Sequence, residues 1–170
     1  QEMSRGLGDV YKRQAYWQSR GWDVIIPDPR GSTGHGRSFT QALHGEWGRA
    51  DVDDVAAVIS ECQRRGWSTP STTVVMGSSS GGMAVLGVLI NYPKSVAGGI
   101  ALYPVSDAAS LAGATHRFEA HYNETLIGPL GDPRYEERSM VGRADFIRQP
   151  LLLMHGTEDS VVPVAQSLSL

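Results

Sequence analysis

Cysteine is almost absent from this chain, since Cys62 is the only one among 170 residues. A single cysteine excludes an internal disulfide framework and a zinc site built from cysteine alone. Long apolar runs are missing too: the longest, residues 83–90, is far too short to span a membrane. There is no surplus of positive charge, because 15 Lys and Arg residues stand against 18 Asp and Glu residues. The charge balance therefore gives no reason to expect a nucleic-acid or membrane partner.

Glycine is present in excess, with 20 residues, which implies many tight turns or close backbone approaches. The rest of the composition, 41% hydrophobic and 19% charged, is typical of an ordered globular chain. Its length suits one domain or a piece of one. Residues 1–14 show no apolar periodicity, and residues 5–14 resemble translated adapter sequence. We therefore predict a non-native or disordered tail over 1–14 and a partial domain over 15–170.

Hydrophobic patterning from residue 15 onward predicts alternating strands and helices. Short apolar runs indicate strands over 23–27, 72–76, 98–103 and 151–155. Helices are expected over 51–65, whose apolar face includes Cys62 as a core residue, and over 83–92. Residues 107–146 carry only helical signals and suit a cap over a site. Continuous apolar strands alternating with helices indicate a mostly parallel sheet with helices on both faces, an α/β fold.

The pattern G-x-S-x-G, with Ser79 at its centre, lies between a predicted strand and a predicted helix. This context is typical of a nucleophilic serine on a sharp turn. Side chains at Gly77 and Gly81 are expected to collide with neighbouring backbone. The backbone N–H of Ser80 would then stabilise an oxyanion. The alternatives are a structural Gly-Ser loop or a phosphate cradle, but the Lys-Ser/Thr pair of a P-loop is missing.

A nucleophilic serine needs a base, and the base needs an acid, in the chain order Ser, acid, His. Asp159 follows the last predicted strand and is our acid candidate; Glu158 is the less favoured neighbour. Asp107 is a second candidate, although capping of the next helix is its simpler role. All five histidines precede Asp159: His35, His44, His116, His121 and His155. If the order holds, the catalytic histidine lies beyond Leu170.

Four segments resemble the prolyl oligopeptidase family in family order, namely residues 28–36, 47–54, 77–82 and 155–163. The acylaminoacyl peptidase and dipeptidyl aminopeptidase branch is the most similar. The resemblance implies an α/β-hydrolase catalytic domain with an incomplete sheet, preceded in the whole protein by a β-propeller. It implies Ser79 as nucleophile and Asp159 as triad acid. The chain departs from the family in lacking its catalytic histidine and the upstream loop that donates a second oxyanion N–H.

The sequence thus predicts a serine peptidase acting on short peptides through an acyl-enzyme, with the 170-residue chain itself inactive. A carboxylesterase or lipase, and a non-catalytic binding module of the same fold, remain alternatives. No motif calls for a cofactor or metal, because His116 and His121 are spaced for different helix faces. His35 is expected to be a partly exposed loop residue, although it could also donate to an oxyanion. The lack of disulfides leads us to expect a cytoplasmic protein.

Overall fold

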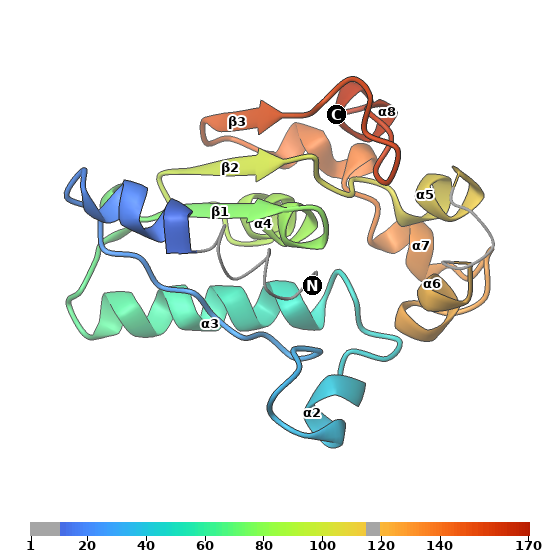
Figure 1. Ribbon diagram of the computed structural model, residues 1–170, viewed down its shortest axis with the longest axis horizontal. Coiled ribbons are helices and arrows are strands. Elements are labelled where there is room, and N and C mark those ends of the chain that lie inside the picture. The colour runs from blue at the N-terminus through green and yellow to red at the C-terminus, as the bar shows by residue number, and fades with distance from the viewer. Residues whose placement is uncertain (1–10, 115–119) are drawn as a thin grey trace.

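The computed structural model describes the backbone of residues 11–114 and 120–170 and the side chains of residues 11–112 and 123–170 (Figure 1). Its centre is a three-stranded parallel sheet in the order β1-β2-β3. The strands are β1 (Val74–Ser78), β2 (Gly98–Leu102) and β3 (Leu151–Met154). Met76 pairs with Ile100, and Ile100 pairs with Leu152, so the strands start at nearly the same level. The C-terminal ends of all three strands therefore lie at one edge of the sheet.

The helix α4 (Ser80–Asn91) packs against β1 and β2, and the helix α3 (Ala50–Arg64) packs against α4. Acidic Asp51 and Asp53 lie in the first turn of α3 and Arg64 in its last, as the helix dipole favours. From Gly82 to Ile90 every residue of α4 is buried. Such a helix is apolar all round because it is covered by other elements on every side.

The two faces of the sheet differ sharply in exposure. On one face, Val75, Leu151 and Leu153 pack into a core with side chains of α3 and α4. On the other, Met76 is 37% exposed, Leu152 53% and Met154 54%. Helices on both faces were expected, but the described residues place the α3 and α4 layer on one face only. The sheet is therefore that of an incomplete α/β fold, because a parallel sheet normally has both faces covered.

The strand predicted over residues 23–27 is not formed, and residues 22–29 have no regular secondary structure. Ile25 and Ile26 are 49% and 55% exposed. The segment crosses α3 in the view of Figure 1, and no strand of the described chain pairs with it. An apolar pattern alone does not make a strand, because its backbone hydrogen bonds must come from a neighbour.

The remaining elements are short and connect the sheet to its surroundings. The region predicted to be helical holds α5 (Ala108–Ala114), α6 (Ala120–Leu126), α7 (Arg134–Glu137) and the 3₁₀ helix η2 (Val141–Phe146). The others are α2 (Arg37–Gln41), η1 (Pro70–Thr72) and α8 (Ala165–Leu168). Residues 11–18 are also helical and mostly exposed, whereas 1–10 of the predicted tail lie outside the described residues. None of the described helices is long and apolar enough to cross a membrane.

Candidate active site

Ser79 occupies the turn that joins β1 to α4, as the motif predicts. Its backbone has φ 55° and ψ −120°, a conformation that residues other than glycine rarely adopt. It is the N-cap residue of α4, yet its side chain makes no capping hydrogen bond. A serine at that position ordinarily accepts a bond from the first turn. The Ser79 hydroxyl is therefore not engaged in capping α4, the role that its position suggests.

Two glycines make this turn possible, and only one of them, Gly77, is among the two that we expected. A Cβ on Gly77 would lie well under 3.0 Å from the carbonyl oxygen of Gly81, so this glycine is required. A Cβ on Gly81 would meet nothing within 4 Å, so its predicted collision is wrong. The crowded position is Gly82, where a Cβ would lie 2.7 Å from Pro104. Gly82 allows α4 to start directly against the chain that leaves β2.

The chain after β2 also fixes the Ser79 backbone. The Ser79 N–H donates to the Leu102 carbonyl at 3.0 Å, and the Val105 N–H donates to the Ser79 carbonyl at 3.2 Å. Between them Tyr103 has φ 36°, and apart from Ser79 it is the only described non-glycine residue with positive φ. No motif around Tyr103 indicates a strained backbone. Strained backbone thus occurs at the ends of two neighbouring strands, on the edge where parallel α/β sheets place their active sites.

The first turn of α4 presents the N–H group that an oxyanion site needs. Ser80 is the first helical residue and is exposed, and its backbone N–H has no backbone acceptor in the described part of the chain. Its side-chain oxygen accepts a hydrogen bond from the indole N–H of Trp47 at 2.8 Å. Free N–H groups at a helix N-terminus favour negative charge. This turn can therefore bind a developing oxyanion beside Ser79.

Asp159 lies in the loop after β3, on the same edge of the sheet as Ser79, because both strands run parallel to β2. Its Oδ1 accepts hydrogen bonds from the N–H groups of Val162 and Val161, both at 2.9 Å. These bonds hold the pKa of the Asp159 carboxyl below its usual value. The carboxyl is only 22% exposed. It is therefore ionised at neutral pH and fixed by its own loop.

His155 supports this loop from beneath. Its Nε2 lies 2.8 Å from the Val162 carbonyl oxygen, and its Nδ1 lies 2.7 Å from Ser167 Oγ. The ring is 4% exposed, and its Nε2 is 4.0 Å from Asp159 Oδ2. Both ring nitrogens have partners within the loop and α8. His155 consequently has a bracing role in this structure.

Asp107, the second acid candidate, caps α5. Its Oδ1 accepts the N–H of Ala109 at 3.0 Å. The sequence did not indicate Gln166, which is buried and binds this region to α8. Gln166 Oε1 accepts the N–H groups of Ser106 and Asp107 at 2.8 and 2.9 Å. These partners are 60 and 59 residues away in the sequence, so no local pattern could have revealed them.

Other singled-out residues have structural surroundings. His35 is 48% exposed, pairs with Asp28 at 3.1 Å and contacts the ring of Phe39. Cys62 is buried on α3, as predicted. Of the tryptophans, Trp47 is buried, whereas Trp22 and Trp67 are 41% and 61% exposed. Among the described side chains, which do not include those of His116 and His121, no three His, Cys, Asp or Glu residues could hold a metal ion.

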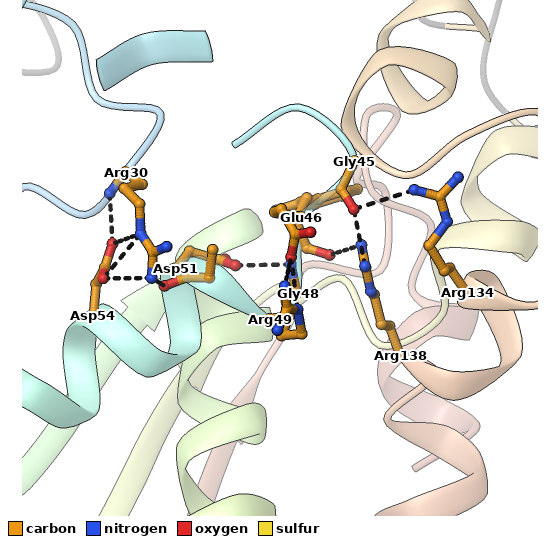
Figure 2. A network of polar contacts seen from close by, with 11 residues as sticks. Arg30, Gly45, Glu46, Gly48, Arg49, Asp51, Asp54, Arg134 and Arg138 are labelled. Carbon is orange, nitrogen blue, oxygen red and sulfur yellow. Dashed lines mark hydrogen bonds and ion pairs between the residues drawn. The ribbon is translucent and has the colours of Figure 1, made fainter. Parts of the chain in front are cut away.

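Polar contacts bind the segment before α3 to the helix and to α7 (Figure 2). Arg30 donates from Nε and Nη2 to the Asp54 carboxylate at 2.9 and 2.8 Å, and its backbone N–H donates to the same group. Burial acts to raise the pKa of Asp54, but the bonds from Arg30 outweigh it and lower that pKa. Two of the segments that carried the family resemblance, 28–36 and 47–54, are thus joined directly.

Comparison with known proteins shows what the whole chain is similar to. The model of the prolyl oligopeptidase family matches residues 9–170. Dipeptidyl aminopeptidase BIII of Pseudoxanthomonas mexicana is 35% identical over 156 residues, which are 88% of this chain and 23% of that enzyme. The acylamino-acid-releasing enzyme of Arabidopsis thaliana is 30% identical over 91% of this chain and 21% of that protein.

Solved structures give the same result. A puromycin-hydrolyzing peptidase of Mycobacterium tuberculosis superposes with a TM-score of 0.78 at 38% identity, covering 83% of this chain and 22% of that one. For the acylaminoacyl peptidase of Pyrococcus horikoshii the TM-score is 0.74 at 26% identity, over 83% of this chain and 23% of that one. The chain thus spans less than a quarter of these relatives and has the α/β-hydrolase fold. It belongs to the prolyl oligopeptidase family.

Proposed function

We propose that the protein to which this chain belongs is a serine peptidase that hydrolyses short peptides through an acyl-enzyme. The observation that supports this most directly is the strained turn at Ser79, whose hydroxyl is not used for helix capping. The free N–H of Ser80 lies next to Ser79, and Asp159 lies at the same edge of the sheet. These are the parts that acyl transfer requires: a nucleophile, an oxyanion donor and an orienting acid.

In the proposed reaction the Ser79 oxygen attacks the substrate carbonyl carbon while a histidine takes the hydroxyl proton. The carbonyl oxygen becomes an oxyanion that accepts a hydrogen bond from the Ser80 N–H. When the peptide C–N bond breaks, the same histidine gives the proton to the leaving amine, and water then hydrolyses the acyl-enzyme. Asp159 orients the histidine and stabilises its positive charge. This base is a histidine outside the described residues, beyond Leu170 in the order Ser, acid, His.

Several finer points belong to the same proposal. The substrate class follows from the family, whose relatives here include a dipeptidyl aminopeptidase and acylamino-acid-releasing enzymes. A β-propeller elsewhere in the whole protein would restrict the site to short peptides. Because the base is missing from it, the 170-residue chain by itself should turn over little substrate. The cytoplasm is the compartment we expect, from the single cysteine.

The test uses the full-length protein, a fluorophosphonate probe and two substrates, an aminoacyl anilide and a short acyl ester. We expect labelling at Ser79 and faster hydrolysis of the anilide. Ser79→Ala should abolish labelling and lower kcat by at least about 10⁴-fold. Ser78→Ala, one residue earlier in β1, is the matched control and should still be labelled. Turnover of the ester alone would indicate a carboxylesterase, and neither labelling nor turnover would indicate a binding module.

A further inference from the structure

We infer that Trp47 is a positioning residue for the oxyanion site, acting through the side chain of Ser80; this inference rests on the proposed function. Trp47 is 3% exposed, and its indole N–H is 2.8 Å from Ser80 Oγ. The two residues are 33 positions apart in the sequence, in different elements. The contact therefore links the start of α4 to the segment that precedes α3.

The direction of this hydrogen bond is fixed by chemistry. An indole N–H can only donate, so the Ser80 oxygen must accept. Serine oxygens near a helix N-terminus commonly accept bonds from the N–H groups of the first turn instead. Because the Ser80 oxygen accepts the Trp47 N–H, the Ser80 side chain is held in one orientation and does not accept a bond from the first turn of α4. The N–H groups beside Ser79 consequently stay available to a substrate oxygen.

The backbone of Trp47 is held from two sides, so the position of its ring is well determined. Its N–H donates to the Leu126 carbonyl at 3.1 Å. Its carbonyl accepts a bond from Arg138 Nη1 at 2.9 Å, and Arg138 Nη2 also donates to the Gly45 carbonyl at 2.9 Å. Figure 2 shows the side chain of Arg138, the residue that follows α7, directed at this segment. Arg138 is 8% exposed, and that burial lowers its pKa.

The next residue adds a third attachment. The Gly48 N–H donates to Asp51 Oδ1 at 2.7 Å. Asp51 is 5% exposed, and burial raises the pKa of its carboxyl. Gly48 has φ +81°, and a Cβ there would lie 2.6 Å from Met83 of α4. Buried polar groups are costly unless they are fully bonded. No buried side-chain nitrogen or oxygen of the described residues lacks a hydrogen-bond partner, and this set holds the Trp47 ring against the first turn of α4.

The position of Trp47 gives a role to part of the 47–54 segment, which takes no direct part in the proposed reaction. A change of a few tenths of an ångström in the Ser80 peptide would misalign its N–H with the oxyanion. Such alignment matters more in the transition state than in substrate binding. Loss of the Trp47 bond should therefore lower kcat and leave KM nearly unchanged. Trp47 would not touch the substrate.

The experiment compares Trp47→Phe, Ser80→Ala and the double variant in the full-length enzyme, with Trp67→Phe as control. Trp67 is 61% exposed and contacts only the Arg65 side chain among aromatic and cationic partners described. A fluorophosphonate titration counts active sites, so each kcat is expressed per competent enzyme. The aminoacyl anilide reports kcat and KM. A peptidyl aldehyde reports oxyanion binding, because its adduct with serine places an oxygen there.

We expect each single variant to lower kcat about tenfold with KM within twofold. The aldehyde inhibition constant should rise by a similar factor, and the double variant should be no worse than either single one. Trp67→Phe should behave as wild type. The inference is overturned if kcat per titrated site stays within twofold in both single variants, or if their effects multiply in the double variant. Failure of the wild type to be labelled or to turn over substrate would instead refute the proposed function, and this inference with it.

Discussion

The turn at Ser79, our proposed nucleophile, follows β1, and the loop of Asp159, our proposed acid, follows β3. We call them the nucleophile turn and the acid loop, and different forces hold them in place. The nucleophile turn depends on close packing of backbone against backbone, at Gly77 and at Gly82. The acid loop depends on hydrogen bonds to side chains, chiefly those of Asp159 and His155. The first arrangement leaves no room for an added methyl group. The second leaves room but depends on which groups carry charge.

This difference suits the two roles. A nucleophile held on a strained turn must not relax, and a tightly packed surrounding resists relaxation at any pH. The acid only has to keep its charge and orientation, and two backbone N–H groups do both for Asp159. We therefore expect changes in volume to damage the turn and changes in charge to damage the loop.

Gly77→Ala should have the largest effect. Its Cβ would meet the Gly81 carbonyl oxygen, which belongs to the backbone and cannot turn aside. We expect a loss of at least about 3 kcal/mol in the free energy of unfolding, or failure to fold. Gly81→Ala is the matched control: it adds the same methyl group with nothing within 4 Å and should change stability by less than about 1 kcal/mol. Urea unfolding of both variants measures the difference, and equal losses would contradict packing as the cause.

Gly82→Ala should come second. Its Cβ would lie 2.7 Å from both Cα and Cβ of Pro104, a buried residue that follows the strained Tyr103. The chain after β2 can shift slightly, so we expect about 2 kcal/mol of destabilisation. Because that chain also bonds the Ser79 backbone, kcat should fall with stability. If Gly82→Ala is as active and as stable as Gly81→Ala, Pro104 can move aside without a loss of stability or of kcat.

Much of the fold could be predicted from local sequence pattern. The helix expected over 51–65 is α3, and the strands expected at 98–103 and 151–155 are β2 and β3. Amphipathic and apolar runs specify such elements because their own neighbours in the chain decide them. The strand expected at 23–27 failed for the opposite reason. Strand pairing is decided by distant residues, and no described strand pairs with that segment.

The candidate site also has features that local sequence determines and features that distant residues determine. The position of Ser79 on a sharp strand-to-helix turn was predictable because its glycines and its context are local. The position of Asp159 in a loop was predictable because it follows an apolar strand. Which glycine is crowded could not be predicted, since Gly82 is constrained by Pro104 from another loop. The bond from Trp47 to Ser80 joins residues 33 positions apart. Sequence spacing carries no information on such contacts.

Asp159→Asn should have the smallest effect on stability and the only one that depends on pH. The folded-state pKa of this carboxyl is lowered by the N–H groups of Val162 and Val161, so its stabilisation is complete above the ordinary Asp pKa of about 3.9. It is lost as pH falls through the lower folded-state pKa. Asparagine can still accept both bonds through its oxygen, but without the charge. We expect Asp159→Asn to lower the free energy of unfolding by about 1 kcal/mol at pH 7, with the difference from wild type shrinking below about pH 4.

Urea unfolding at a series of pH values measures this difference. The control is Glu158→Gln at the exposed neighbouring residue, which should show no such trend. A difference that stayed constant down to pH 3 would mean that shape, and not charge, holds the acid loop.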